Sequence, residues 1–110
     1  MSVDVTFRTQ EKVCCPHCGF VVSTEDSGVA ECSGRGWYPL LEELGYYVPW
    51  DQRTEENNWY GKDMELTPEQ TLAAHRFIKK HPDLYGGDEA RALLADALLE
   101  DLVVTINADW

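Results

Sequence analysis

Residues 14–19 read Cys-Cys-Pro-His-Cys-Gly, and a fourth cysteine follows at Cys32. Within this stretch Cys15 and Cys18 have the spacing of a zinc knuckle, in which two thiolates face the same way and the next residue, here Gly19, allows the backbone to turn. Because the other cysteines cluster around this turn, the N-terminal part of the chain is predicted to be built around it.

Short strands are predicted on both sides of the cysteine turn. Residues 3–8 alternate apolar and polar side chains, a period typical of a half-buried strand. After the turn, residues 20–24 predict a second strand, the turn-forming residues 25–28 end it, and residues 29–32 predict a third. Such a hairpin would bring Cys32 back beside the cysteine turn.

Local signals predict three helices in the rest of the chain. The clearest is Thr-Pro-Glu-Gln at residues 67–70, where the threonine can cap a helix, the proline suits its first position and the glutamine completes a capping box. This helix should end before Pro82. An apolar stripe predicts a shorter helix over residues 37–44, stopped by Gly45, and Asp88 is predicted to cap the third.

The assembled prediction is one α+β domain over residues 1–110. A small antiparallel sheet is formed by the N-terminal strand, the hairpin after the cysteine turn and a C-terminal strand, and about three helices pack on one of its faces. The three predicted regions are the strand and hairpin region at 1–36, a mainly helical region at 37–101 that contains a loop at 46–66, and the C-terminal strand at 102–110.

Composition indicates a cytoplasmic protein. The chain has 110 residues, of which 44% are hydrophobic, enough to bury a core without obligatory disulfides or metals. No apolar run approaches the roughly 20 residues that span a bilayer, and the N-terminal residues do not resemble a secretory signal. We therefore expect no membrane association, and cysteines that are reduced or metal-bound.

The formal net charge of −11 limits the partners that the chain can bind. Residues 36–110 hold fifteen of the acidic and six of the basic side chains. Direct nucleic-acid binding by counterion release is not expected from such a surface, whereas a basic protein partner is. An alternative is an acidic mimic of nucleic acid that inhibits a DNA-binding protein.

A structural zinc ion is the predicted cofactor. Cys15 and Cys18 would supply half of a tetrahedral site, and Cys32 a third ligand. The spacing leaves the fourth ligand open, with Cys14 the first candidate. The others are His17, His75 and His81. Reduced thiols in a purely structural turn are the competing interpretation.

The same cysteine turn allows a redox alternative. Cys-Pro-His-Cys resembles the active-site motif of thioredoxin-like periplasmic oxidases, which implies a thiol–disulfide oxidoreductase using Cys15 and Cys18. In that family the motif opens a long helix. Here Gly19 and the β-branched residues 21–22 predict a strand instead, and this departure argues against the redox interpretation.

Exposed aromatic side chains are the predicted partner-binding residues. The segment from Trp37 to Tyr60 is rich in tryptophan and tyrosine, about half of which should be needed in the core. The residues predicted to contact a protein partner are Tyr47, Trp50, Trp59 and Tyr60. No catalytic residues are predicted, because the chain has no His-Glu-x-x-His pattern and no glycine-rich phosphate loop.

The order of these features resembles a set of small proteins of bacteriophages and bacterial genomes. The matching pieces are the turn at 15–19, the helix end and aromatic residues at 40–47, Trp50 and the segment 67–106. Where those proteins have Asn-Ile-Thr-His-Asn before the first helix, this chain has residues 32–36, Cys-Ser-Gly-Arg-Gly. The resemblance implies the fold and no activity. The predicted function is a small interaction protein of phage or mobile-element type.

Overall fold

The computed structural model of the chain describes residues 3–110, with all their side chains except those of Cys14 and residues 21–24. The elements follow in the order β1 (Asp4–Cys14), β2 (Val21–Ser33), η1 (Arg35–Trp37), α1 (Tyr38–Glu43), η2 (Trp50–Gln52), β3 (Met64–Leu66), α2 (Pro68–Lys80), α3 (Gly87–Glu100) and β4 (Val103–Asp109).

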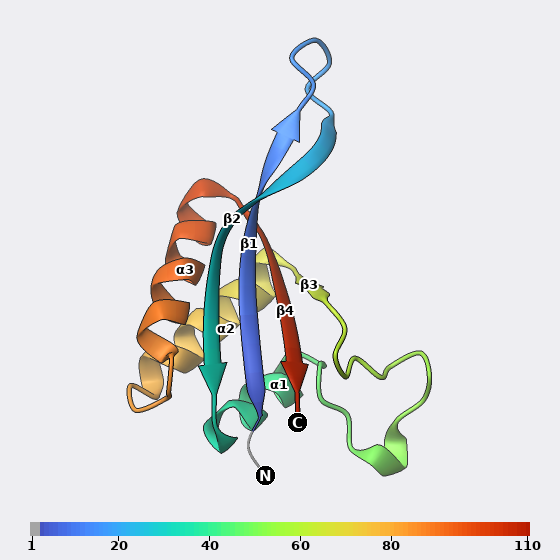
Figure 1. Cartoon of the computed structure of the whole chain (residues 1–110), viewed down its shortest axis with the longest axis vertical. Coiled ribbons are helices and arrows are strands. Elements are labelled where there is room, and N and C mark those ends of the chain that lie inside the picture. The colour runs from blue at the N-terminus through green and yellow to red at the C-terminus, as the bar shows by residue number, and fades with distance from the viewer. Residues whose placement is uncertain (1–2) are drawn as a thin grey trace.

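The fold is an α+β domain with one four-stranded antiparallel sheet, as predicted. The strand order is β2-β1-β4-β3, so β1 lies inside the sheet, between β2 and β4, and β2 and β3 form its edges. Helices α2 and α3 cover one face, and α1 closes the end of the sheet near both termini (Figure 1). Among the described helices, none has the length and apolar character that crossing a membrane requires.

The register of β1 places alternate side chains in the core. Val5 is paired with Cys32 on one side and Ala108 on the other, and Phe7 with Ala30 and Ile106. All of these side chains point to the helical face and are buried, whereas the residues between them face away from the helices. Helix-side residues complete the core, among them Trp37, Leu40, Leu41, Ala74, Ile78, Ala90, Leu94 and Ala97.

The predicted turn at residues 25–28 is wrong. Strand β2 continues through it, and the polar residues form a β-bulge instead: Gly28 pairs with Thr9, whereas Asp26 pairs with Gln10. Pairing with β1 thus overrides the local turn preference. Gly28 lets α3 approach the bulge closely, because a Cβ atom there would lie 2.6 Å from Leu93 Cδ1 and that side chain would have to shift.

Beyond the bulge, β1 and β2 form a two-stranded ribbon. Strand β4 pairs with β1 only from Asp4 to Gln10, so the rest of β1 has β2 as its one neighbour in the sheet. The ribbon extends away from the body of the domain and carries the cysteine turn at its end (Figure 1). Isolated two-stranded hairpins are marginally stable in water, so this segment depends on its own turn for order.

The helix starts agree with the sequence prediction in part. Thr67 and Gln70 form the predicted capping box at the start of α2, with hydrogen bonds of 3.1 and 2.9 Å, and Gly45 has the left-handed φ of +77° expected after α1. The predicted cap of α3 by Asp88 is wrong. Left-handed Gly86 precedes that helix, and Asp88 lies inside its first turn, where a carboxylate favours the helix dipole.

The loop predicted over residues 46–66 is shorter, because its last three residues form β3, which pairs with β4. Its start is fixed by buried Tyr46. The Tyr46 hydroxyl donates to the carbonyl oxygen of Lys62 at 2.7 Å and accepts from the amide of Ala108 at 2.8 Å. One side chain therefore ties both ends of the loop to the last strand.

Replacing Tyr46 with Phe should lower the free energy of unfolding by about 1–3 kcal/mol, because it leaves a buried amide and a carbonyl without their partner. Urea denaturation followed by fluorescence measures the change. Tyr85→Phe is the matched control, because the Tyr85 side chain is largely exposed and should change stability by less than about 0.5 kcal/mol. Equal effects of the two substitutions would contradict the assigned role of Tyr46.

Gly86→Ala should destabilise the chain more than Gly45→Ala. Both glycines have a left-handed φ, which costs alanine about 1 kcal/mol. A Cβ on Gly45 meets nothing within 4 Å, whereas a Cβ on Gly86 would lie 2.5 Å from the carbonyl oxygen of Glu31 on β2. Moving this backbone apart should add about 1–3 kcal/mol for Gly86, measured by urea denaturation of both variants. A smaller loss for Gly86→Ala than for Gly45→Ala would show that α3 can shift freely away from β2.

Candidate functional site

The cysteine turn closes the ribbon with a short, hydrogen-bonded backbone. The amide of Gly19 donates to the carbonyl oxygen of Cys15 at 2.8 Å. The amide of Cys15 donates to the carbonyl oxygen of Phe20 at 2.7 Å. Gly19 adopts φ +74°, a left-handed conformation that residues with a Cβ rarely take. A tight turn is therefore present at residues 15–19, as the sequence predicts, and zinc binding there stays a prediction.

Hydrogen bonds converge on the Cys15 sulfur. The backbone N–H of His17 is the strongest donor, followed by the backbone N–H and the thiol of Cys18, and together they lower the pKa of Cys15 from its usual value. Both Cys15 and Cys18 are free thiols, and Cys18 is exposed. Donors of this kind stabilise a thiolate, the form that binds metals and attacks electrophiles.

Cys32 lies far from this turn, so the prediction that it returns beside Cys15 and Cys18 is wrong. Cys32 pairs with Val5, near the start of β1, whereas Cys14 pairs with Val21. The rise along β2 from Val21 to Cys32 is roughly 35 Å. The error comes from the predicted turn at 25–28, because a continuous strand carries Cys32 away from the tip.

The buried Cys32 thiol has a structural role in the domain body. Its Sγ atom is 3.5 Å from the carbonyl oxygen of Gly86, to which it donates. Burial, and second the carboxylate of Glu89, raise the pKa of Cys32 to about 12. This thiol therefore stays protonated near neutral pH in the metal-free domain.

The other candidate ligands do not assemble a complete site. His75 belongs to α2 and His81 follows its end, where its ring packs at 4.5 Å from that of Phe77. The side chain of Cys14 lies outside the described residues. Within the part of the chain that the structure describes, no three histidine, cysteine or carboxylate side chains come close enough to hold one ion. Cys15 and Cys18 would supply two of the four ligands that a tetrahedral zinc site requires.

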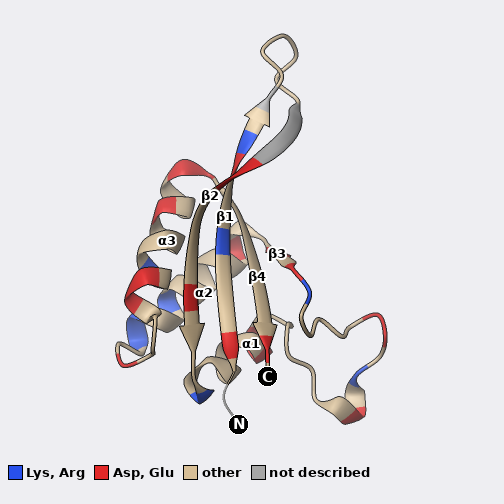
Figure 2. Ribbon diagram, viewed as in Figure 1, with Lys and Arg blue, Asp and Glu red and all other residues tan. Residues whose placement is uncertain are grey.

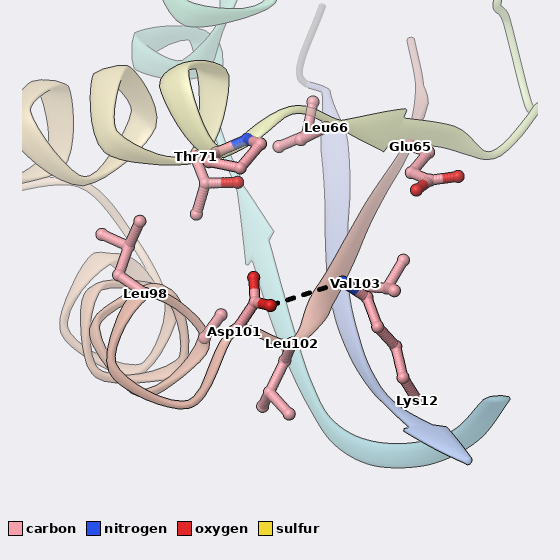
Figure 3. A pocket seen from close by; sticks show the side chains of 10 residues that line it. Lys12, Glu65, Leu66, Thr71, Leu98, Asp101, Leu102 and Val103 are labelled. Atoms are coloured by element: carbon pink, nitrogen blue, oxygen red, sulfur yellow. Dashed lines mark ion pairs between the residues drawn. The ribbon is translucent and has the colours of Figure 1, made fainter. Parts of the chain in front are cut away.

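A small pocket lies at the root of the ribbon. Lys12 on β1 forms an ion pair at 3.5 Å with Asp101, which follows α3, and Leu98 and Leu102 line the same space (Figure 3). Its volume of about 110 Å³ is well below the roughly 300 Å³ of the smallest usual ligand sites. We interpret this pocket as the place where the ribbon packs against the body of the domain and not as a ligand site.

A cluster of rings holds the long loop against the C-terminus. The Trp110 ring lies 4.8 Å from Tyr60 and 5.2 Å from Tyr47, both in edge-to-face contacts. The Arg53 guanidinium lies 5.5 Å from the centre of the Trp110 ring and donates twice to the carbonyl oxygen of Val48, at 2.8 and 3.1 Å. These contacts immobilise the loop on both sides of η2.

Of the four predicted partner-binding residues, Trp50 is the most exposed. Its side chain on η2 is 82% exposed, beside a shallow hollow that is lined by Arg53 and Glu55 among others. Trp59 instead packs against the core, and Tyr47 is half-buried in the ring cluster. Tyr60 is exposed along one side and contacts Trp110 on the other.

Phe20 is an exposed residue that the sequence prediction overlooked. A short strand is predicted over residues 20–24, but β2 begins at Val21, and Phe20 is 74% exposed beside the cysteine turn. A large apolar residue directly after a turn with two cysteines is a signal that could have identified it.

Comparison with known proteins adds no relative, since no family model, curated protein or solved structure matches the chain.

The three described thiols should react with iodoacetamide in a fixed order. In reduced, chelator-treated protein near neutral pH, Cys15 should be alkylated first, because its pKa is lowered, and Cys32 last, because it is buried and its pKa is raised to about 12. Peptide mass mapping over time measures the rates. The order should disappear in denaturant, and a Cys32 rate equal to that of Cys15 in the folded chain would contradict the assigned environments.

Proposed function

We propose that this chain is a small protein-binding module whose main contact is Trp50. The observation that carries the proposal is that Trp50 is 82% exposed on a loop that is otherwise immobilised. Tryptophan is strongly enriched among the residues that dominate binding energy, and a rigid loop loses little conformational entropy when a partner binds.

The surroundings of Trp50 favour a basic partner. Asp51 and Glu55 lie on the same loop, Glu55 lines the hollow beside Trp50, and the whole chain carries a net charge of −11. Arg53 is the one basic residue between Trp50 and Tyr60, against three acidic ones, Asp51, Glu55 and Glu56, so this segment keeps a net charge of −2. A partner that inserts an apolar or cationic side chain beside Trp50 fits this surface.

The proposal includes a zinc ion that stabilises the ribbon, held by Cys15 and Cys18. It also includes a cytoplasmic setting, where thiols stay reduced, and a phage or mobile-element origin, which rests on the pattern resemblance alone. The geometry of the cysteine turn supports the zinc ion, and the three free thiols support the cytoplasmic setting.

Affinity capture from a bacterial lysate tests the Trp50 contact. Trp50→Ala should weaken retention of the specific partner by roughly 30-fold, equivalent to loss of about 2 kcal/mol from a central contact. Leu99→Ala is the matched control, because Leu99 is equally exposed but lies on α3. Its capture should equal that of the unmodified chain, and both variants should keep the circular dichroism spectrum of the folded domain.

Retention that is unaffected by Trp50→Ala would overturn the assigned contact. Retention that is lost at high salt and independent of Trp50 would favour the acidic-mimic alternative, since binding dominated by charge is screened by salt.

A thiol–disulfide oxidoreductase is the second candidate function. The lowered pKa of Cys15 and the exposure of Cys18 favour it. However, the motif lies in a turn between β1 and β2 and not at a helix N-terminus, which is what activates the thiol in the thioredoxin-like oxidases. Insulin reduction in the presence of dithiothreitol separates the two functions, because a binding module should show no acceleration over the reagent alone.

A further inference from the structure

We propose that one zinc ion joins two copies of this chain tip to tip, bound by Cys15 and Cys18 of each copy. The inference deepens the zinc element of the proposed function and rests on it. It is independent of the Trp50 contact, which lies in the loop at the other end of the domain (Figure 1).

The ligand count is the first argument. Structural zinc takes four ligands in a tetrahedron, and the turn offers two sulfurs that face each other, since the Cys18 thiol hydrogen-bonds to Cys15. Cys32 lies roughly 35 Å along β2. No third ligand side chain joins the pair among the described residues. A second copy supplies the missing two thiolates in the same geometry.

The position of the turn is the second argument. The turn lies at the far end of the ribbon, and β1 has no pairing with β4 beyond Gln10. The body of the domain therefore does not surround the turn (Figure 1). Two ribbons can therefore meet end to end around a two-fold axis without contact between the bodies. Each copy then contributes the same surface, as closed two-fold dimers require.

Charge is the third argument. The chain has a net charge of −11, which opposes self-association through most of its surface. Residues 11–25, which form the ribbon and its turn, contain two acids, Glu11 and Glu25, and one base, Lys12, so the ribbon carries a net charge of −1 out of the total of −11. In Figure 2 the cysteine turn carries neither acidic nor basic side chains, whereas the body carries many acidic ones. The bodies of a tip-to-tip dimer stay separated by more than the Debye length of about 8 Å.

Phe20 supplies the fourth argument. Its ring is 74% exposed next to Gly19. In a two-fold arrangement around the zinc, the two Phe20 rings lie beside the shared site and can cover the thiolates from water. Burial of such a ring on association is worth roughly 1.5–3 kcal/mol per side chain.

The binding reaction balances without a redox step. Four thiols lose their protons as four zinc–sulfur bonds form, each about 2.3 Å long, and the zinc stays divalent. The product is a tetrathiolate site with no open position, so its role is assembly and not catalysis.

Native mass spectrometry and sedimentation of the full chain test the bridge. Reduced, metal-free protein should be monomeric, and titration with zinc chloride in a non-thiol reductant should double the mass at half an equivalent of zinc per chain. Excess chelator should restore the monomer.

Cys15→Ser with Cys18→Ser should abolish both zinc uptake and dimer, whereas Cys32→Ala and Trp50→Ala should leave both unchanged. Phe20→Ala should keep the stoichiometry and raise the zinc concentration at half-dimerisation by about a hundredfold or more, because each dimer loses two rings.

The other outcomes are separable. One zinc per monomeric chain would overturn the bridge but retain the zinc element of the proposed function, with ligands completed inside one copy. Absence of zinc uptake would overturn both, and a dimer that forms equally without zinc, or in the Cys15→Ser and Cys18→Ser variant, would overturn the bridge.

Discussion

The simultaneous pairing of β1 with β2 and with β4 is the constraint on which the remaining structure depends. It joins the two ends of the chain in one sheet, and its register turns Val5 and Phe7 toward the helices. The helices have a continuous apolar face to cover only because these strands present one. Contacts so distant in sequence cost loop-closure entropy, which the buried face must offset.

The unequal lengths of the paired strands create the candidate site. Strand β2 has 13 residues and β1 has 11, whereas β4 has seven, so the first two continue past the third. A cysteine turn within the body would have been surrounded by other side chains, including other potential ligands. At the end of the ribbon, Cys15 and Cys18 are accessible to solvent and to other molecules.

Local chemistry could be predicted from the sequence, and long-range placement could not. The capping box at Thr67 and Gln70 depends on neighbours within one helical turn, so its residues alone predict it. The bulge at Gly28 depends on what lies opposite in β1, which no local pattern contains, and the misplacement of Cys32 followed from it. Trp50 and Trp59 both lie in a loop without an apolar period, so the sequence pattern does not distinguish their burial. Only the packing of the loop on Trp110 and the core separates the exposed ring from the half-buried one.

The outer edge of β2 has a consequence for how copies of the chain can associate. An edge strand exposes unpaired amide and carbonyl groups that can template pairing with another chain, and β2 is long enough to do so. Glu25, Asp26 and Glu31 place like charges along this edge, and the bulge interrupts its regular spacing. The opposite edge, β3, has three residues. The charges, the bulge and the short opposite edge thus oppose indefinite growth of the sheet by strand addition.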